Sequence, residues 1–271
     1  MPSTTSLTRH TLTIDGRALS YLDSGGAGRP LLALHGGMSE ALAFAGLAAH
    51  LGPAWRVIAP DQRGHGDSDR APDYGREGYV SDALALLDHL GLRTPVVVLG
   101  YSLGGLNACH LAAAHPERVR ALIDIDATVE IHSSTEDAVH DLFGFLGGMR
   151  YTAPTREELL AAAGPVGSRL VEQALRPLPS GEGWRLPFHP QDMLDSAAAC
   201  RGDHWDAWLA GDCPALLVHA TRSQTLRQET ADAMVARRAG TSYAPLDGDH
   251  FLPFTDPRGV HEAVAAFLAA L

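Results

Sequence analysis

Short runs of hydrophobic residues alternate along this chain with longer stretches in which hydrophobic positions recur every three or four residues. The run at 30–35 (PLLALH), for example, is followed by a helical pattern at 41–51. Short uninterrupted apolar runs are typical of strands buried on both faces, and the longer patterns are typical of amphipathic helices. Five further runs predict strands: 55–60, 95–100, 118–126, 214–220 and 241–246.

The segment 10–23 has a different pattern, because polar and apolar residues alternate on both sides of Asp15-Gly16. This dipeptide between two alternating segments is the signal of a tight β-hairpin. The two hairpin strands and the six strand-like runs together predict an α/β fold with a mostly parallel, eight-stranded sheet flanked by helices.

The alternation stops between residues 127 and 208, where helical pieces are separated by clusters of glycine and proline. A segment inserted between two parallel strands is expected to cover the carboxyl edge of the sheet, where α/β proteins place their sites. We therefore expect a core formed by residues 1–126 and 209–271, and an inserted helical cap formed by residues 127–208.

Composition and charge exclude several function classes. Of 271 residues, 45% are hydrophobic, and the formal net charge is −11. Nucleic acids and anionic membranes require basic patches, so neither is expected as a partner. No apolar run approaches the roughly 18 residues of a membrane span, and the N-terminus lacks a secretory pattern, which favours a cytoplasmic location. The three cysteines form no CxxC pair, so no disulfide framework is expected.

The motif GYSLGG at 100–105 carries the strongest chemical signal. It has the form G-x-S-x-G, and it lies between a predicted strand and a predicted helix, the context that a nucleophile elbow requires. Glycines 100 and 104 would permit the tight turn that exposes the hydroxyl of Ser102. The amide of Leu103, at the helix N-terminus, would point to where an oxyanion forms.

Two other strand-to-loop junctions supply matching chemistry. HGG at 35–37 follows a predicted strand, and the amide of Gly37 is a candidate for the second half of an oxyanion hole. GDH at 248–250 follows the last predicted strand, which makes His250 a candidate general base for Ser102.

With these motifs the chain resembles the α/β-hydrolase family over nearly its whole length. The matching segments are HGG, DQRGHGDSD (61–69), GYSLGG, HPERVRALIDID (115–126) and DGDHFLPFTDP (247–257). The resemblance implies a Ser-His-acid triad in which the serine attacks, the histidine moves the proton and a carboxylate orients the imidazole.

The acid departs from the usual pattern of this family. Many members place it shortly after the strand that 214–220 matches, but the corresponding position here is Gln224, a neutral amide. Asp124 and Asp126 lie two apart in the preceding strand, so they are expected on the same side of it. Some relatives, among them certain haloalkane dehalogenases and cofactor-free dioxygenases, carry their acid in this region. Asp126 is the favoured candidate, with Asp124 and Glu229 as alternatives.

The leading hypothesis is a serine hydrolase that cleaves a carboxylic ester or lactone through an acyl-enzyme on Ser102, with a bulky hydrophobic ester or a macrolide-type lactone as possible substrates. Alternatives are a cofactor-free, dioxygenase-like enzyme that uses His250 and Asp126, or a non-catalytic ligand receptor.

No metal-ligand spacing and no phosphate-binding loop is present, so neither a metal nor a cofactor is expected. A monomer or homodimer is expected. Candidate substrate-binding residues, chosen mainly as large apolar side chains of the cap, are Met38, Phe143, Phe145, Trp184, Phe188 and Trp205.

Overall fold

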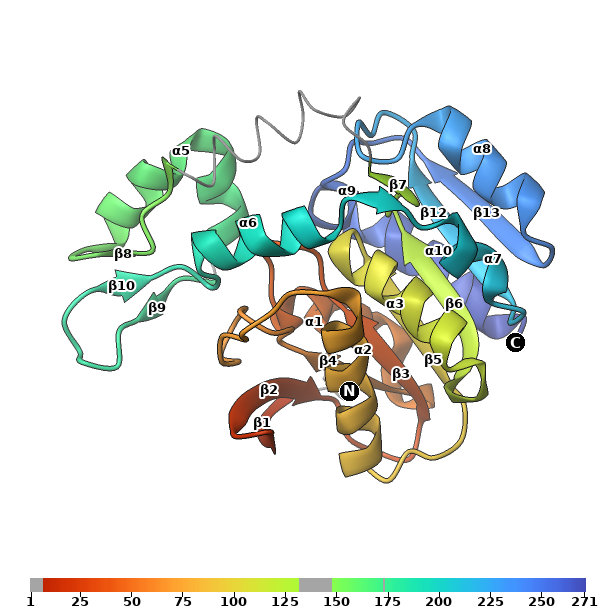
Figure 1. Ribbon diagram of the computed structural model, residues 1–271, viewed down its shortest axis with the longest axis horizontal. Coiled ribbons are helices and arrows are strands. Elements are labelled where there is room, and N and C mark those ends of the chain that lie inside the picture. Colours follow the sequence, from red (N-terminus) through yellow and green to blue (C-terminus); the bar gives the residue numbers. More distant parts are fainter. Residues whose placement is uncertain (1–6, 132–147, 173) are drawn as a thin grey trace.

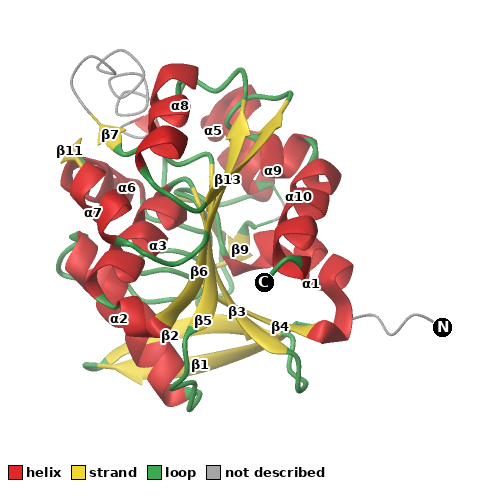
Figure 2. Cartoon of the chain, turned by 90° about the vertical axis from the view of Figure 1, so that its right-hand side faces the viewer, coloured by secondary structure: helices red, strands yellow, loops and turns green. Residues whose placement is uncertain are grey.

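The computed structural model describes residues 7–131, 148–172 and 174–271. Its centre is an eight-stranded sheet in the order β1-β2-β4-β3-β5-β6-β12-β13, which confirms the predicted fold class (Figure 1 and Figure 2). The strands of this sheet are Thr8–Ile14 (β1), Arg17–Asp23 (β2), Arg29–Leu34 (β3), Trp55–Pro60 (β4), Val96–Tyr101 (β5), Val119–Ile125 (β6), Ala215–Ala220 (β12) and Thr241–Leu246 (β13).

The N-terminal strands differ from the rest of the sheet in direction. β1 and β2 form the predicted antiparallel hairpin, and Asp15 and Gly16 have the positive φ values, 49° and 79°, that its tight turn requires. β2 also pairs antiparallel with β4, whereas all pairs from β4 to β13 are parallel. Strands β3, β5, β6, β12 and β13 therefore end at one edge of the sheet, where the loops with the candidate site residues begin.

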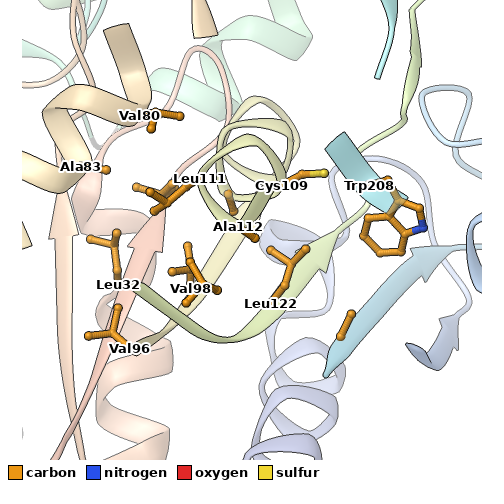
Figure 3. Close-up of a cluster of buried hydrophobic side chains, with 14 of the residues drawn as sticks. Leu32, Val80, Ala83, Val96, Val98, Cys109, Leu111, Ala112, Leu122 and Trp208 are labelled. Carbon is orange, nitrogen blue, oxygen red and sulfur yellow. The ribbon is translucent and has the colours of Figure 1, made fainter. Parts of the chain in front are cut away.

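Helices cover both faces of the sheet, with α2, α3, α7 and α8 on one face and α1, α9 and α10 on the other (Figure 2). Successive strand residues enter opposite cores: Leu32 and Val98 pack under α2 and α3 (Figure 3), and Leu31 packs towards α1 and α10. Burial on both faces explains why these strands are uninterrupted apolar runs. The helices are Ala45–Leu51 (α1), Arg76–His89 (α2), Leu103–Ala114 (α3), Trp205–Ala210 (α7), Gln228–Arg237 (α8), Leu252–Thr255 (α9) and Pro257–Ala269 (α10), with short 3-10 turns at Ala41–Phe44, Gly52–Ala54 and Pro116–Arg118.

The chain leaves the sheet after β6 and returns at β12. Within this excursion β8, β10 and β9 form a small sheet, and β7 pairs with β11. Figure 1 shows α5 and the small sheet at one end of α6, apart from the eight-stranded sheet. The elements are Glu130–Ile131 (β7), Thr152–Ala153 (β8), Arg156–Val171 (α5), Arg176–Pro177 (β9), Trp184–Arg185 (β10), Pro190–Ala199 (α6) and Gly202–Asp203 (β11).

Polar contacts attach α6 to the loop and helix that follow β4. Asp192 accepts hydrogen bonds from Arg70 at 2.5 and 2.8 Å, although that arginine is largely exposed. Ser196, one turn along α6, lies 2.9 Å from the hydroxyl of Tyr79 in α2. These contacts place α6 over the carboxyl edge of the sheet. No helix in the described ranges is long and apolar enough to cross a membrane.

Candidate active site

Ser102 lies in the sharp turn between β5 and α3. Its backbone has φ 52° and ψ −118°, a conformation that costs energy for a residue with a Cβ. The strain therefore falls on the serine, whereas the flanking glycines allow close packing. A Cβ on Gly100 would lie 2.1 Å from the carbonyl oxygen of Gly104, and one on Gly104 would lie 2.0 Å from that of Leu34. The turn presents Ser102 at the carboxyl edge of the sheet.

His250 lies in the loop that follows β13, and its ring reaches the serine. Its Nε2 is 2.9 Å from Oγ of Ser102. Tyr101 supports this loop, because its hydroxyl donates to the carbonyl oxygen of His250 at 2.7 Å and its ring centre lies 5.2 Å from that of the imidazole. Since Tyr101 immediately precedes Ser102, one short segment positions the side chains of Ser102 and His250.

Asp126 directly follows β6 and bonds the opposite nitrogen of the same ring. Its Oδ2 is 2.8 Å from Nδ1 of His250, and the residue is fully buried. Because a carboxylate only accepts hydrogen bonds, Nδ1 carries the ring proton, and Nε2 of the neutral imidazole accepts from the Ser102 hydroxyl. The structure thus brings together the three residues that the sequence analysis selected for catalysis.

The remaining contacts of Asp126 come from β12 and the loop after it. The amide of Ala220 donates to Oδ1 at 3.0 Å, and the hydroxyl of Ser223 donates to Oδ2 at 2.6 Å. The amide of Asp126 donates to the carbonyl oxygen of Val218 at 2.8 Å, and its φ is 52°. Sequence reasoning missed Ser223, because a short polar side chain in a loop leaves no mark in the hydrophobic pattern.

The alternative acids lie elsewhere. Asp124 was expected on the same side of the strand as Asp126, but its Oδ1 accepts from the amide of Ala127 at 2.9 Å and closes the turn after β6. Burial raises the pKa of Asp124 to about 8, so this carboxyl group is mainly uncharged at neutral pH. Glu229 is exposed in the first turn of α8, and Gln224 lines the cavity described below.

The two candidate residues for an oxyanion hole, Gly37 and Leu103, both lie at this edge. Leu103 is the first residue of α3, where amides have no partner within the helix. Gly37 lies in the loop after β3. Its neighbour Gly36 packs so closely on the Tyr101 ring that a Cβ would lie 2.7 Å from it. Gly37 and Leu103 both line the cavity beside Ser102, so their amides can donate to an oxygen held there.

A cavity of about 500 Å³ opens beside Ser102 and His250. This volume falls within the range of pockets that bind small organic molecules, and most of the wall is hydrocarbon. The main apolar side chains of the lining are Met38, Leu106, Ile131, Met193, Phe251 and Phe254.

The predicted substrate-binding residues are only partly found in this lining. Met38 lies there as expected. Phe188 does not, because its side chain is 1% exposed and packs in an apolar cluster inside the inserted segment, and Trp184 packs against the same cluster. Phe143 and Phe145 lie outside the described residues.

Trp205 also lies away from the cavity, so the expectation that it binds substrate is wrong. Its side chain packs in the main core together with Trp208. The indole Nε1 donates to Glu130 at 2.6 Å, and the guanidinium of Arg237 lies 3.9 Å from the ring centre. Large aromatic rings bury the most apolar area, so here they stabilise the packing of α7 on the core.

Helix α6 lines the cavity, a role that the sequence pattern did not reveal. One face of α6 and the residue after it contribute Met193, Ser196, Ala197 and Cys200. The steps of three, four and seven residues place these side chains on one side of a helix. The amphipathic pattern of DMLDSAAAC predicts a helix with one apolar face, but small side chains do not indicate that this face lines a cavity.

Charged groups in the lining are mainly acidic. Glu130 and Asp249 are the acidic residues of the described lining, and Arg222 is its single residue with a permanent positive charge. Arg222 forms an ion pair with Asp247, and both side chains are largely exposed. The sequence after Ile131, residues 132–147, contains no lysine or arginine. No group of three His, Cys, Asp or Glu side chains suited to a metal ion occurs in the described part of the chain.

Comparison with known proteins identifies the family. The profile of the alpha/beta hydrolase fold matches residues 29–257, and the chain belongs to this family. It is 32% identical to lipase LipV of Mycobacterium tuberculosis over 95% of this chain and 99% of that protein. It is 27% identical to 2-(acetamidomethylene)succinate hydrolase of Mesorhizobium japonicum over 94% of this chain and 93% of that protein.

Solved structures agree on the fold. A crystal structure of E-2-(acetamidomethylene)succinate hydrolase superposes with a TM-score of 0.84 at 24% identity, covering 97% of this chain and all of that one. The two sequence relatives named above are a lipase and a hydrolase, and they support the assignment of this chain as a hydrolase.

Proposed function

We propose that this protein is a serine hydrolase that cleaves a carboxylic ester or lactone through an acyl-enzyme on Ser102. The observation that carries the proposal is the continuous hydrogen-bonded path from Asp126 through His250 to Ser102 at the wall of an apolar cavity. Each member has the partner that its role needs: a nucleophile next to a base, and a base oriented by a carboxylate.

The first half of the reaction forms the acyl-enzyme. Oγ of Ser102 attacks the carbonyl carbon while Nε2 of His250 takes the hydroxyl proton, and the buried Asp126 stabilises the resulting imidazolium. The carbonyl oxygen becomes an oxyanion that accepts hydrogen bonds from the amides of Gly37 and Leu103. When the tetrahedral intermediate collapses, His250 gives its proton to the leaving alkoxide. In a lactone that alcohol stays attached to the acyl group.

The second half uses water. His250 removes a proton from a water molecule, and the hydroxide attacks the acyl carbon to form a second oxyanion in the same position. Collapse releases the carboxylate product and returns the proton to Ser102. The products are one alcohol and one acid, or a single hydroxy acid from a lactone.

The lining supports a neutral, mainly apolar substrate. Hydrocarbon side chains from Met38, Leu106 and Met193 favour a desolvated acyl or alcohol group. A substrate carboxylate would meet Glu130 and Asp249 and would find no unpaired cation in the described lining, because Arg222 already pairs with Asp247. Like charges repel, and the repulsion is stronger where less water surrounds them.

A substrate panel tests the proposal. Neutral p-nitrophenyl esters of increasing acyl length, a p-nitrophenyl monoester of a dicarboxylic acid and neutral lactones are compared on the wild type and Ser102→Ala. We expect hydrolysis of the neutral esters, a lower kcat/KM for the carboxylate-bearing ester, and nearly complete loss in Ser102→Ala. A fluorophosphonate should add one adduct to the wild type and none to the variant. Hydrolysis that survives in Ser102→Ala would contradict the mechanism.

The position of the acid after β6, where Asp126 bonds His250, favours a second function. In this function the His250–Asp126 pair abstracts a proton in a cofactor-free oxygenation. In that chemistry the base acts on the substrate and the serine is not the nucleophile. Consumption of dissolved oxygen with retained turnover in Ser102→Ala would favour it, and unchanged turnover without oxygen would exclude it. The receptor interpretation rested on the neutral Gln224, and it loses that support because Asp126 bonds His250 instead.

A further inference from the structure

Ser223 lies in the loop after β12, the same loop in which Gln224 occupies the position where many relatives have their acid. It is buried, and its hydroxyl lies 2.6 Å from Oδ2 of Asp126. The same carboxylate oxygen lies 2.8 Å from Nδ1 of His250. The loop therefore contributes a donor to an acid that comes from another strand.

The direction of the Ser223 hydroxyl is determined by its other contacts. A serine hydroxyl has one proton to donate and two lone pairs that can accept. The amides of Thr225 and Leu226 donate to Oγ at 3.1 and 3.2 Å and occupy both lone pairs. The single proton is left for Asp126, which can only accept. The amide of Ser223 donates to the carbonyl oxygen of Ala220 at 2.8 Å and fixes the backbone.

We propose that Ser223 is a positioning residue that orients the carboxylate of Asp126 and adjusts how strongly it favours the charged form of His250. The proposal rests on the proposed function, in which Asp126 orients the histidine. Three donors, from Ala220, Ser223 and His250, hold the two oxygens of a carboxylate that has no access to water. Such donors replace solvent, spread the negative charge and fix the plane of the group.

Removing this donor has two consequences. The carboxylate loses one constraint on its orientation, so the imidazole is held less well in its productive position. Its negative charge also becomes more concentrated on the oxygen that faces Nδ1, which favours the imidazolium. Because only the neutral ring can act as a base, the acid limb of the pH–rate profile should move to higher pH.

The test is Ser223→Ala, assayed with the neutral ester that the wild type hydrolyses fastest. We expect kcat to fall about tenfold, the scale of one hydrogen bond to a charged group, with little change in KM and with the acid limb at higher pH. Ser223→Thr keeps the hydroxyl and should restore both quantities. Ser20→Ala is the matched control, because Ser20 is equally buried but its hydroxyl accepts from Arg9, away from the site.

A purely structural role for Ser223 would give a different result. Ser223→Ala would then lower the melting temperature but leave kcat and the acid limb unchanged, and that outcome would overturn the proposal. A loss of kcat of equal size in Ser20→Ala would also count against it.

A second readout separates this proposal from the proposed function. In protein with ¹⁵N-labelled histidine, the His250 signal, assigned by its loss in His250→Gln, is titrated in the wild type and in Ser223→Ala. The titration of the His250 ring should move to higher pH in the variant. This measurement needs no substrate, so it tests Ser223 even if Ser102→Ala keeps its activity and the hydrolase mechanism fails. An unchanged titration rejects the role of Ser223 alone.

Discussion

The two walls of the cavity are built in different ways. The floor, formed by the loops after β5, β6, β12 and β13, holds Ser102, Asp126, Ser223 and His250 through hydrogen bonds of 2.6 to 2.9 Å. The roof, formed by one face of α6 and the residue after it, presents Met193, Ser196, Ala197 and Cys200. Directional contacts determine the geometry of reacting atoms, and apolar contacts determine which groups fit. We therefore expect the floor to set the chemistry and the roof to set the choice of substrate.

The roof is nonetheless attached to the rest of the molecule, through the loop and helix that follow β4. Asp192 and Ser196 bond Arg70 and Tyr79 from the face of the molecule that α2 covers. Asp192 is buried, so its paired guanidinium compensates for a desolvated charge. A roof held by such contacts can carry side chains at fixed distances from Ser102, which selective binding requires.

The largest expected effect belongs to the floor. Asp126→Asn keeps the shape of the side chain but removes the charge that stabilises imidazolium and favours the wrong tautomer, so kcat should fall by roughly 10²–10⁴-fold. The fall should be similar for every substrate in the panel, because the roof is unchanged. Steady-state kinetics on a short and a long ester measure it. Near-normal kcat would remove Asp126 from the mechanism. Gln224→Ala should lower kcat far less.

The second prediction concerns Trp205, a residue of the inserted segment that the sequence analysis placed among the substrate-binding residues. Trp205→Ala should destabilise the fold by about 3 kcal/mol or more, because the ring packs in the main core. The ranking of substrates should stay the same. Chemical denaturation gives the free energy of unfolding, and the ester panel gives the ranking. A change of ranking without loss of stability would return Trp205 to the cavity wall.

The floor was more predictable from sequence than the roof, for a physical reason. Ser102 and His250 each follow a predicted strand, and parallel strands end at the same edge of a sheet, so the pattern alone brings the two residues to one edge. Asp126 follows from the same rule, since β6 lies beside β5 in the sheet. Its positive φ could not be predicted, and that conformation is why Asp124 and Asp126 contact different elements instead of sharing a side.

The roof depends on packing between distant segments. Hydrophobic size predicts that Phe188 and Trp205 are buried, but not which of several interiors receives them. Small residues such as Ala197 line a cavity because they leave space, and an absence of volume has no sequence signal of its own. The position of α6 is determined by contacts with Arg70 and Tyr79, more than a hundred residues away in the chain.

The third prediction enlarges a side chain of the roof. Ala197→Leu should lower kcat/KM for a bulky ester about tenfold relative to an acetate ester, since one or a few methylenes in an apolar pocket change discrimination on this scale. Ala198→Leu is the matched control, because this neighbour on α6 is exposed and is not part of the described lining. If both variants change the ratio equally, the effect comes from the helix and not from the cavity.

The smallest expected effect on activity belongs to Asp124→Asn, the same aspartate-to-asparagine change made two residues before Asp126. Asp124 is buried, and its desolvation raises its pKa to about 8 from a usual value of 3.8. Between these two values the folded state binds more protons than the unfolded state, so stability falls as the pH rises through this window.

An asparagine at position 124 keeps the oxygen that accepts from the Ala127 amide but carries no charge. Asp124→Asn should therefore melt at the same temperature as the wild type near pH 4 and roughly 10 °C or more higher at pH 8. Its kcat should stay close to that of the wild type, because Asp124 does not bond His250. Melting curves across this pH range test the effect on stability, and a parallel assay tests the effect on kcat. A difference in melting temperature that stays constant with pH would show that Asp124 is ionised in the fold. A large loss of kcat would show that the two aspartates act together.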